Sequence, residues 1–143
     1  MHTIAIRLHP GDDLKRSLIR YCTQNKISAA FILSCVGSLT HATIRFANQA
    51  VSETLSEKLE IITLSGTLSQ HGAHLHIAVS DCTGKVTGGH LMENTYIYTT
   101  GEIVLGVLPA TSFKRELDQD TGYQELAIFN NNDLKTNRAP LKK

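Results

Sequence analysis

The sequence predicts a strand-dominated α+β domain in which at least one helix packs on a largely antiparallel sheet. Two observations carry this prediction. Most apolar segments are short and alternate with polar residues, as strands do, and glycine or polar turn residues separate them. One stretch near the N-terminus instead repeats its apolar residues at helical spacing. We expect a single domain over residues 1–130 and a polar C-terminal tail over residues 131–143.

The composition narrows the class of protein. Hydrophobic residues make up 41% of the chain and charged residues 19%, which is typical of a folded globular protein. The net charge of +1 gives no electrostatic case for a nucleic-acid-binding domain. Three cysteines form no even disulfide framework, so we expect reduced thiols and a cytoplasmic location. The sequence contains neither a signal peptide nor an apolar run of the roughly 20 residues that span a bilayer, which predicts no membrane association.

The first elements are a strand and a helix. Residues 3–8 alternate like a strand, and a Pro-Gly pair then breaks the pattern. Asp12 or Asp13 can cap the following helix, which should end near Asn25. The apolar stripe of the helix consists of Leu14, Leu18, Ile19 and Cys22. Three basic residues are expected on its solvated side: Lys15, Arg16 and Arg20.

The rest of the chain reads as strands. Gly37 permits a bend between the strands predicted at residues 27–36 and 40–46, and Gly66 bends the strand predicted at residues 59–68. Residues 48–56 form a loop or hairpin end. His41 is expected to be an exposed strand residue. The predicted strands cover residues 27–36, 40–46, 59–68, 73–80, 95–108, 112–117 and 123–129, and a further strand begins at residues 85–87.

A histidine-rich hairpin is the most informative stretch for function. His74 and His76 lie two residues apart on a predicted strand and therefore share a face. If residues 82–84 form a three-residue loop that ends in a left-handed glycine, His90 lies opposite His76. A loop one residue shorter or longer would move His90 to the other face, and Gly88-Gly89 could shift the register through a bulge.

Three converging neutral imidazoles are typical of a zinc or other transition-metal site with a fourth position left for water or an anion. The alternative is that His-x-His lies on an exposed strand face and binds nothing. Other candidate residues around such a site are Arg45, Glu102 and the pair Gly37-Ser38. Glu102 is exposed, paired with a base such as Arg45, or close to the histidines; Gly37-Ser38 is a weak match to an anion-binding turn.

The chain resembles the plants-and-prokaryotes-conserved (PPC) domain family, and its bacterial single-domain members in particular. The resemblance rests on ordered motifs across the central two-thirds of the chain, among them G-S-L-T-H-A-T-I-R at residues 37–45 and L-E-I-I-T-L-S-G-T-L-S at residues 59–69. It continues through H-L-H-I-A-V-S-D at residues 74–81 and G-K-V-T-G-G-H-L at residues 84–91. The segment R-E-L-D-Q-D-T-G-Y-Q-E-L at residues 115–126 also matches.

The resemblance implies a compact α/β fold with a mostly antiparallel sheet and a homotrimeric assembly. It also implies a three-histidine cluster that looks like a zinc site, and His74, His76 and His90 fall at its positions. In plant members the segment that matches residues 57–62 serves protein–protein interaction. It therefore suggests a partner interface formed by Glu57, Lys58, Leu59, Glu60, Ile61 and Ile62.

Two departures from the family pattern bear on function and fold. Plant members bind DNA through AT-hooks with an Arg-Gly-Arg-Pro core, and this sequence has no such core, so their DNA binding does not carry over. Asn94 stands where a glycine is usual, and asparagine tolerates the same left-handed turn.

The sequence is compatible with two candidate functions. The first is a homotrimeric binding or regulatory module with a three-histidine metal site, associated with DNA only weakly or through partners, by family analogy. The second is a zinc-dependent enzyme or small-ligand-binding protein of unknown substrate, in which Glu102 could act as a general base. The sequence contains no pattern that assigns catalytic residues or names a substrate.

Overall fold

The computed structural model describes residues 1–130, so the predicted tail lies outside the described residues. Nine strands and one helix make up this part of the chain, and no helix in it is long and apolar enough to cross a membrane. The elements are β1 (His2–Leu8), α1 (Leu14–Gln24), β2 (Ala30–Arg45), β3 (Glu53–Leu55), β4 (Leu59–Ser69), β5 (Gly72–Ser80), β6 (Val86–Leu91), β7 (Tyr96–Val107), β8 (Thr111–Leu117) and β9 (Gln124–Asn130).

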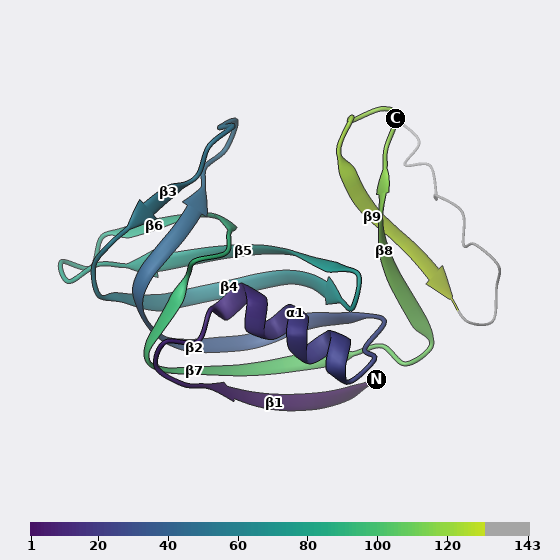
Figure 1. The fold of residues 1–143 in the computed structure, drawn as a ribbon, viewed down its shortest axis with the longest axis horizontal. Helices are drawn as coiled ribbons and strands as arrows, with labels where there is room; N and C mark the ends of the chain where they lie inside the picture. Colours follow the sequence, from purple (N-terminus) through teal and green to yellow (C-terminus); the bar gives the residue numbers. More distant parts are fainter. Residues whose placement is uncertain (131–143) are drawn as a thin grey trace.

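The main sheet is antiparallel and curls back on itself. Its strands follow the order β1-β7-β2-β4-β5-β6, and β3 pairs with β2 beside this path. β6 also returns to the end of β2, where Ile44 lies opposite Leu91 and Arg45 opposite His90. Strands β2, β4, β5 and β6 thus form a closed circuit of pairing. The β8–β9 hairpin forms a separate two-stranded sheet that stands to one side of the main sheet (Figure 1).

The predicted α+β class is wrong, because the structure is mostly antiparallel β-sheet. The described residues contain one helix of 11 residues against nine strands. A strongly curved sheet can bury much of its apolar surface within its own concave side, so a single short helix suffices as cover. Fully buried side chains of the sheet illustrate this core: Leu39, Ile44, Leu75, Val79, Leu91, Ile97, Ile103 and Leu105.

The helix is fixed at both ends by side chains. Asp13 is the N-cap, and its Oδ1 accepts a hydrogen bond from the backbone N–H of Arg16 at 2.9 Å. At the other end, the Asn25 amide donates to the Tyr21 carbonyl oxygen at 2.9 Å. The helix packs against β4, β5 and β7. The predicted stripe is largely confirmed, since the helix buries Leu14, Ser17, Leu18 and Cys22.

The segment predicted as two strands is one long strand, β2. The expected bend at Gly37 takes the form of a local irregularity, because the pairing of β2 with β7 shifts between Gly37 and Leu39. Gly37 has a φ of +149°, where a side chain would be strained. The short strand β3 lies inside the segment expected to be a loop or hairpin end. It pairs with β2 over only three residues, which is too short for a periodic signal.

Candidate metal centre

The β5–β6 hairpin carries all three histidines, and its turn has the predicted form. The Asp81 N–H donates to the Lys85 carbonyl oxygen, and the Gly84 N–H donates to the Asp81 carbonyl oxygen, both at 3.0 Å. Gly84 has a φ of +82°, the left-handed conformation expected at the end of a three-residue loop. The Asp81 carboxylate also accepts hydrogen bonds from the Thr83 hydroxyl and backbone, which together lower its pKa. Several hydrogen bonds therefore stabilise the turn at residues 82–84, and this turn sets the register of the hairpin.

This register brings His76 directly opposite His90. The pairing runs without a shift through Gly88 and Gly89, so the bulge considered from the sequence does not form. Leu75, Ile77 and Val79 of the same strand point into the core, which leaves the alternate histidines on the outer face. His74 and His76 are exposed, and His90 is half-buried.

The three imidazoles form a compact cluster. One ring nitrogen from each of His74, His76 and His90 can be chosen so that all three lie within 4.8 Å of one another. Nε2 of His74 lies 3.2 Å from Nδ1 of His90, and these two rings stack with an interplanar angle of 13°. The His76 ring meets the other two edge-on, with centroid separations of 5.0 Å and 4.5 Å.

The surroundings of His74 and His90 favour the neutral form of their imidazoles. Partial burial lowers the pKa of His74, and the positive charge of Arg115 and neighbouring His76 lower it further. Partial burial likewise lowers the pKa of His90, assisted by Arg45 and by the other two histidines. A neutral imidazole has a free lone pair, which is the form that coordinates a metal.

The donor set fits a transition metal. Zinc binds imidazole nitrogens at about 2.0–2.1 Å, so two ligands of a tetrahedral ion lie about 3.3 Å apart. The 3.2 Å separation between Nε2 of His74 and Nδ1 of His90 is close to this value, and a ring nitrogen of His76 lies within 4.8 Å of a ring nitrogen of each. Three imidazoles suit zinc, copper, nickel or iron better than calcium or magnesium, which prefer oxygen ligands.

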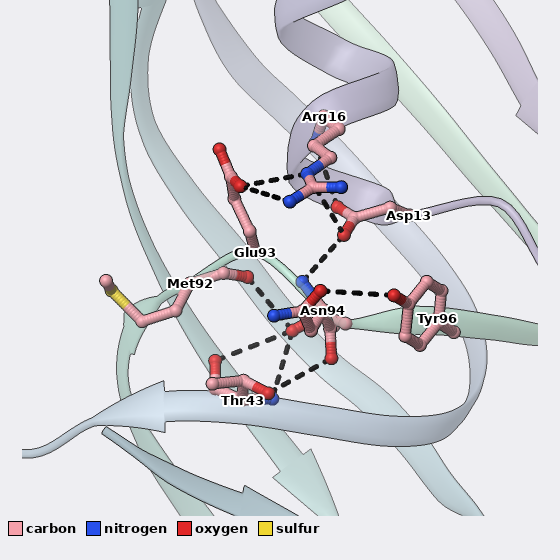
Figure 2. Close-up of polar contacts among 8 residues, drawn as sticks. Asp13, Arg16, Thr43, Met92, Glu93, Asn94 and Tyr96 are labelled. Carbon is pink, nitrogen blue, oxygen red and sulfur yellow. Dashed lines mark hydrogen bonds and ion pairs between the residues drawn. The ribbon is translucent and has the colours of Figure 1, made fainter. Parts of the chain in front are cut away.

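A polar network fixes the turn that follows β6 and so supports His90. Figure 2 shows the Asn94 N–H donating to Oδ2 of Asp13 at 2.6 Å, while the Tyr96 hydroxyl donates to the Asn94 side chain at 3.1 Å. The Asn94 carbonyl oxygen accepts from the Thr43 hydroxyl at 3.0 Å. Asn94 has a φ of +64°, the left-handed conformation expected from the sequence. The N-cap of α1 is therefore tied to the β6–β7 turn.

A cavity of about 950 Å³ opens beside the cluster. His74 and His90 form part of its wall, whereas His76 does not. Three basic residues from different elements also line it, namely Lys15 of α1, Arg45 of β2 and Arg115 of β8. The remaining lining includes Asn48, Gln49, Met92, Tyr123, Gln124 and Glu125.

The other residues expected near the site are distributed over the sheet. Arg45 is paired with His90 and lines the cavity. Ser38 is buried, and its hydroxyl shares a 2.7 Å hydrogen bond with that of Thr99, away from the cavity. Gly37 pairs with Gly101 and also lies outside the cavity lining. Glu102 is exposed on β7 opposite Val36, and two strands separate β7 from β5 in the sheet.

The segment expected to contact partners straddles the start of β4. Leu59 and Ile61 belong to the buried core, with exposures of 3% and 5%. Glu57, Lys58, Glu60 and Ile62 are exposed, so these are the residues of the segment that a partner can reach. The Lys58 ammonium lies 4.4 Å from the centre of the Tyr98 ring.

Sequence reasoning missed two of the three basic residues in the cavity. Lys15 was expected on the solvated side of the helix, but it is half-buried, and this burial lowers its pKa. Arg115 lies on the β8–β9 hairpin, and its guanidinium donates to the Thr67 hydroxyl at 3.0 Å. No periodic signal in the sequence relates the hairpin that carries Arg115 to His74 or His90. Only the packing of β8 against β4 brings them together.

Comparison with solved structures agrees with this fold. The structure of a hypothetical protein from Salmonella enterica has a TM-score of 0.88 and 42% identity, covering 90% of this chain and 94% of its own. The metal-containing protein AF0104 from Archaeoglobus fulgidus has a TM-score of 0.75 and 29% identity, covering 88% and 93%. A protein from Bacteroides thetaiotaomicron that is proposed to bind DNA has a TM-score of 0.78 at 24% identity, covering 87% and 90%.

Among curated proteins, the chain is similar to the bifunctional protein GlmU of two Synechococcus strains. Each is 50% identical over 123 residues, which is 86% of this chain. The chain spans only a fifth of the length of these relatives, since the match covers 20% of each. The family model of the Plants and Prokaryotes Conserved (PCC) domain matches residues 1–109. Because this match covers most of the chain, the protein belongs to the PCC domain family, called PPC above.

Proposed function

We propose that this protein is a binding module whose single domain, residues 1–130, holds one transition-metal ion between His74, His76 and His90. The observation that carries the proposal is the mutual closeness of three imidazole nitrogens, all within 4.8 Å of one another. The similarity to a metal-containing protein from Archaeoglobus fulgidus supports it, at 29% identity over most of both chains. Zinc is the ion we favour, because three histidines with one open position are a common zinc arrangement.

Elemental analysis of the untagged protein tests the proposal. The wild-type protein should contain one metal ion per chain, and His76→Ala should contain far less than one while it remains folded. His41→Ala is the matched control, because His41 is also an exposed strand histidine but contacts Tyr96 rather than the cluster. Full metal content in the His76→Ala protein would refute the site.

A second candidate function is a metal-dependent enzyme or small-ligand binder. The cavity of about 950 Å³ favours it, because His74 and His90 form part of its wall. Zinc with three protein ligands keeps a fourth position for water or a ligand atom, and that position could face the cavity. Catalytic turnover of a small molecule would favour this candidate over a regulatory module. So would a ligand that co-purifies with the untagged protein and is detected by mass spectrometry.

We also propose a homotrimer with an interface that includes the exposed residues of the 57–62 segment. Three neighbouring strands each leave a large apolar side chain on the surface: Val36 on β2, Ile62 on β4 and Tyr98 on β7. Burial of such side chains between subunits would be favourable. Light scattering should give three times the chain mass, and Ile62→Asp should lower it, whereas Ile128→Asp on β9 should not. A stable wild-type monomer at micromolar concentration would contradict the trimer.

We expect the isolated chain to bind DNA only weakly and without sequence preference, and any association with DNA to run through partners. A net charge of +1 offers little attraction to a polyanion. Sequence-selective binding that resists salt in a mobility-shift assay would contradict this expectation. We propose a cytoplasmic location on the basis of the free cysteines, two of which are buried.

A further inference from the structure

Three cations from distant parts of the chain meet at one cavity. Lys15 comes from the first turn of α1, Arg45 from the end of β2 and Arg115 from β8. The three basic side chains belong to three different elements. The positive charge of the cavity therefore does not come from one helix face or from one run of basic residues in the sequence. His74 and His90 line the same cavity, which therefore borders directly on the proposed metal site.

None of these cations makes a direct ion pair with a carboxylate within residues 1–130. Glu125 acts on Arg115 only at longer range, as Glu93 and Asp13 act on Lys15. Within residues 1–130, both ion pairs are made by Arg16, which contacts Glu93 and Asp13 outside the cavity lining. Arg45 donates to the Gln49 carbonyl oxygen at 3.3 Å, and Arg115 donates to the Thr67 hydroxyl. The cavity wall holds a single acidic side chain, Glu125, against three basic ones. Positive charge lining a concave surface attracts and concentrates small anions.

We infer that this cavity binds a small phosphorylated molecule, with its phosphoryl group held by Lys15, Arg45 and Arg115 beside the histidine cluster. This inference rests on the proposed function in one respect, since an oxygen of the phosphoryl group would occupy the open position of the metal. Arginine forks match phosphate oxygens in pairs, and a lysine adds a point charge. The polar side chains Asn48, Gln49, Tyr123 and Gln124 would contact the remainder of the molecule.

The shape of the site favours a small molecule over nucleic acid. A volume of about 950 Å³ lies within the range of small-molecule pockets. A duplex instead requires a broad basic surface, and the chain as a whole carries a net charge of only +1. Lys15, Arg45 and Arg115 line one hollow of the surface, and its volume limits the size of the anion that can reach all three.

Calorimetric titration of inorganic phosphate into the full chain, loaded with zinc and freed of excess metal, tests the inference. The wild-type protein should bind phosphate, and acetate should bind more weakly because it has fewer oxygens and less charge. Lys15→Gln and Arg115→Gln should each weaken phosphate binding about tenfold or more, since each removes a charge-assisted hydrogen bond. The matched controls are Lys85→Gln in the β5–β6 turn and Arg20→Gln on α1, both outside the cavity lining, and both should bind as wild type.

Metal content is measured in every sample, so that failure of the metal-site proposal can be distinguished from failure of the phosphate-binding proposal. One zinc per chain without a heat of binding from millimolar phosphate would overturn the cavity proposal and leave the metal site intact. Duplex DNA that displaces phosphate, and whose own affinity drops in the same two variants, would overturn it in favour of a nucleic-acid contact. If the wild-type chain holds no metal, the proposed function fails. Titration of phosphate into the metal-free chain then tests the cavity proposal by itself. Loss of phosphate binding in Lys15→Gln and Arg115→Gln, but not in the control variants, supports the proposal. Equal phosphate binding by all variants rejects it.

Discussion

His74 on β5 and His90 on β6 meet at 3.2 Å through Nε2 and Nδ1, on strands whose register pairs His90 with His76 instead. The contact is therefore diagonal across the hairpin, which long planar side chains can achieve between non-opposed residues. One ring must donate and the other accept if the two share a proton. A metal ion bound by both nitrogens would take the place of that proton, and the 3.2 Å separation is close to the spacing of two ligands on a tetrahedral ion.

Acidification is expected to weaken both the metal-free fold and metal binding. Partial burial lowers the pKa of His74 and His90 in the folded chain, so below about pH 6.5 the unfolded chain binds more protons. Stability is therefore complete above that value, declines as the pH falls through it, and levels off below the folded pKa values. Metal affinity should decline as the pH falls below about 6.5, because protonation of His74 and His90 competes with the metal for the same nitrogen atoms.

Denaturant unfolding of the metal-free protein across about pH 5 to 8 measures the first effect. His74→Gln should flatten the dependence of stability on pH in this range, whereas His41→Gln should leave it as in wild type. A wild-type chain that becomes more stable as the pH falls from 7 to 5.5 would contradict the sign.

Gly89→Ala should destabilise the hairpin that presents His90. A Cβ at this position would lie 2.7 Å from the Arg45 carbonyl oxygen and 2.9 Å from Cγ2 of Ile44, so β6 would have to move away from β2. Overpacking of this kind costs about 1–3 kcal/mol of the free energy of unfolding. Urea unfolding and metal analysis should reveal lower stability and weaker metal binding. Thr87→Ala on the same strand is the control, and unchanged stability in Gly89→Ala would rule out a tight contact.

Asp13 should be a major support of the helix and of the β6–β7 turn. Its carboxylate accepts from the Arg16 N–H at 2.9 Å and from the Asn94 N–H at 2.6 Å (Figure 2). Asp13→Ala should lower the free energy of unfolding by about 2 kcal/mol, because it removes the helix cap and leaves a second donor without its partner. Asp13→Asn should cost roughly half as much, since an amide oxygen still caps the helix. Equal stability of the Ala and Asn variants would show that capping does not matter here.

Only one of the three thiols should react in the native protein. Burial raises the pKa of Cys22 to about 11 and that of Cys35 to about 12, so both stay protonated and inaccessible at neutral pH. Cys82 is exposed in the hairpin turn. Titration with a chromogenic disulfide reagent should release one equivalent from the native chain and three after denaturation. Cys82→Ser should remove the native signal; rapid reaction of that variant would mean that the core opens readily.

Much of the hairpin was predictable, because its determinants are local. Two-residue spacing assigned His74 and His76 to one face, and the turn residues Asp81 and Gly84 set a loop length that brought His90 opposite His76. The positions of most strands, and a helix N-cap at Asp12 or Asp13, follow from similarly short-range patterns, and the structure selects Asp13. The fold class was misjudged because these local patterns do not report how far a sheet curves.

Tertiary structure alone determined which basic residues line the cavity. Lys15 lies on the polar side of a helix and Arg115 on a hairpin whose sequence has no periodic link to the histidines. They converge because α1 and β8 both pack against β4, and because β6 closes back onto β2 at Arg45. Local periodicity specifies which face of an element a side chain occupies. The long-range packing of elements determines which faces meet, and that information is spread over the whole core.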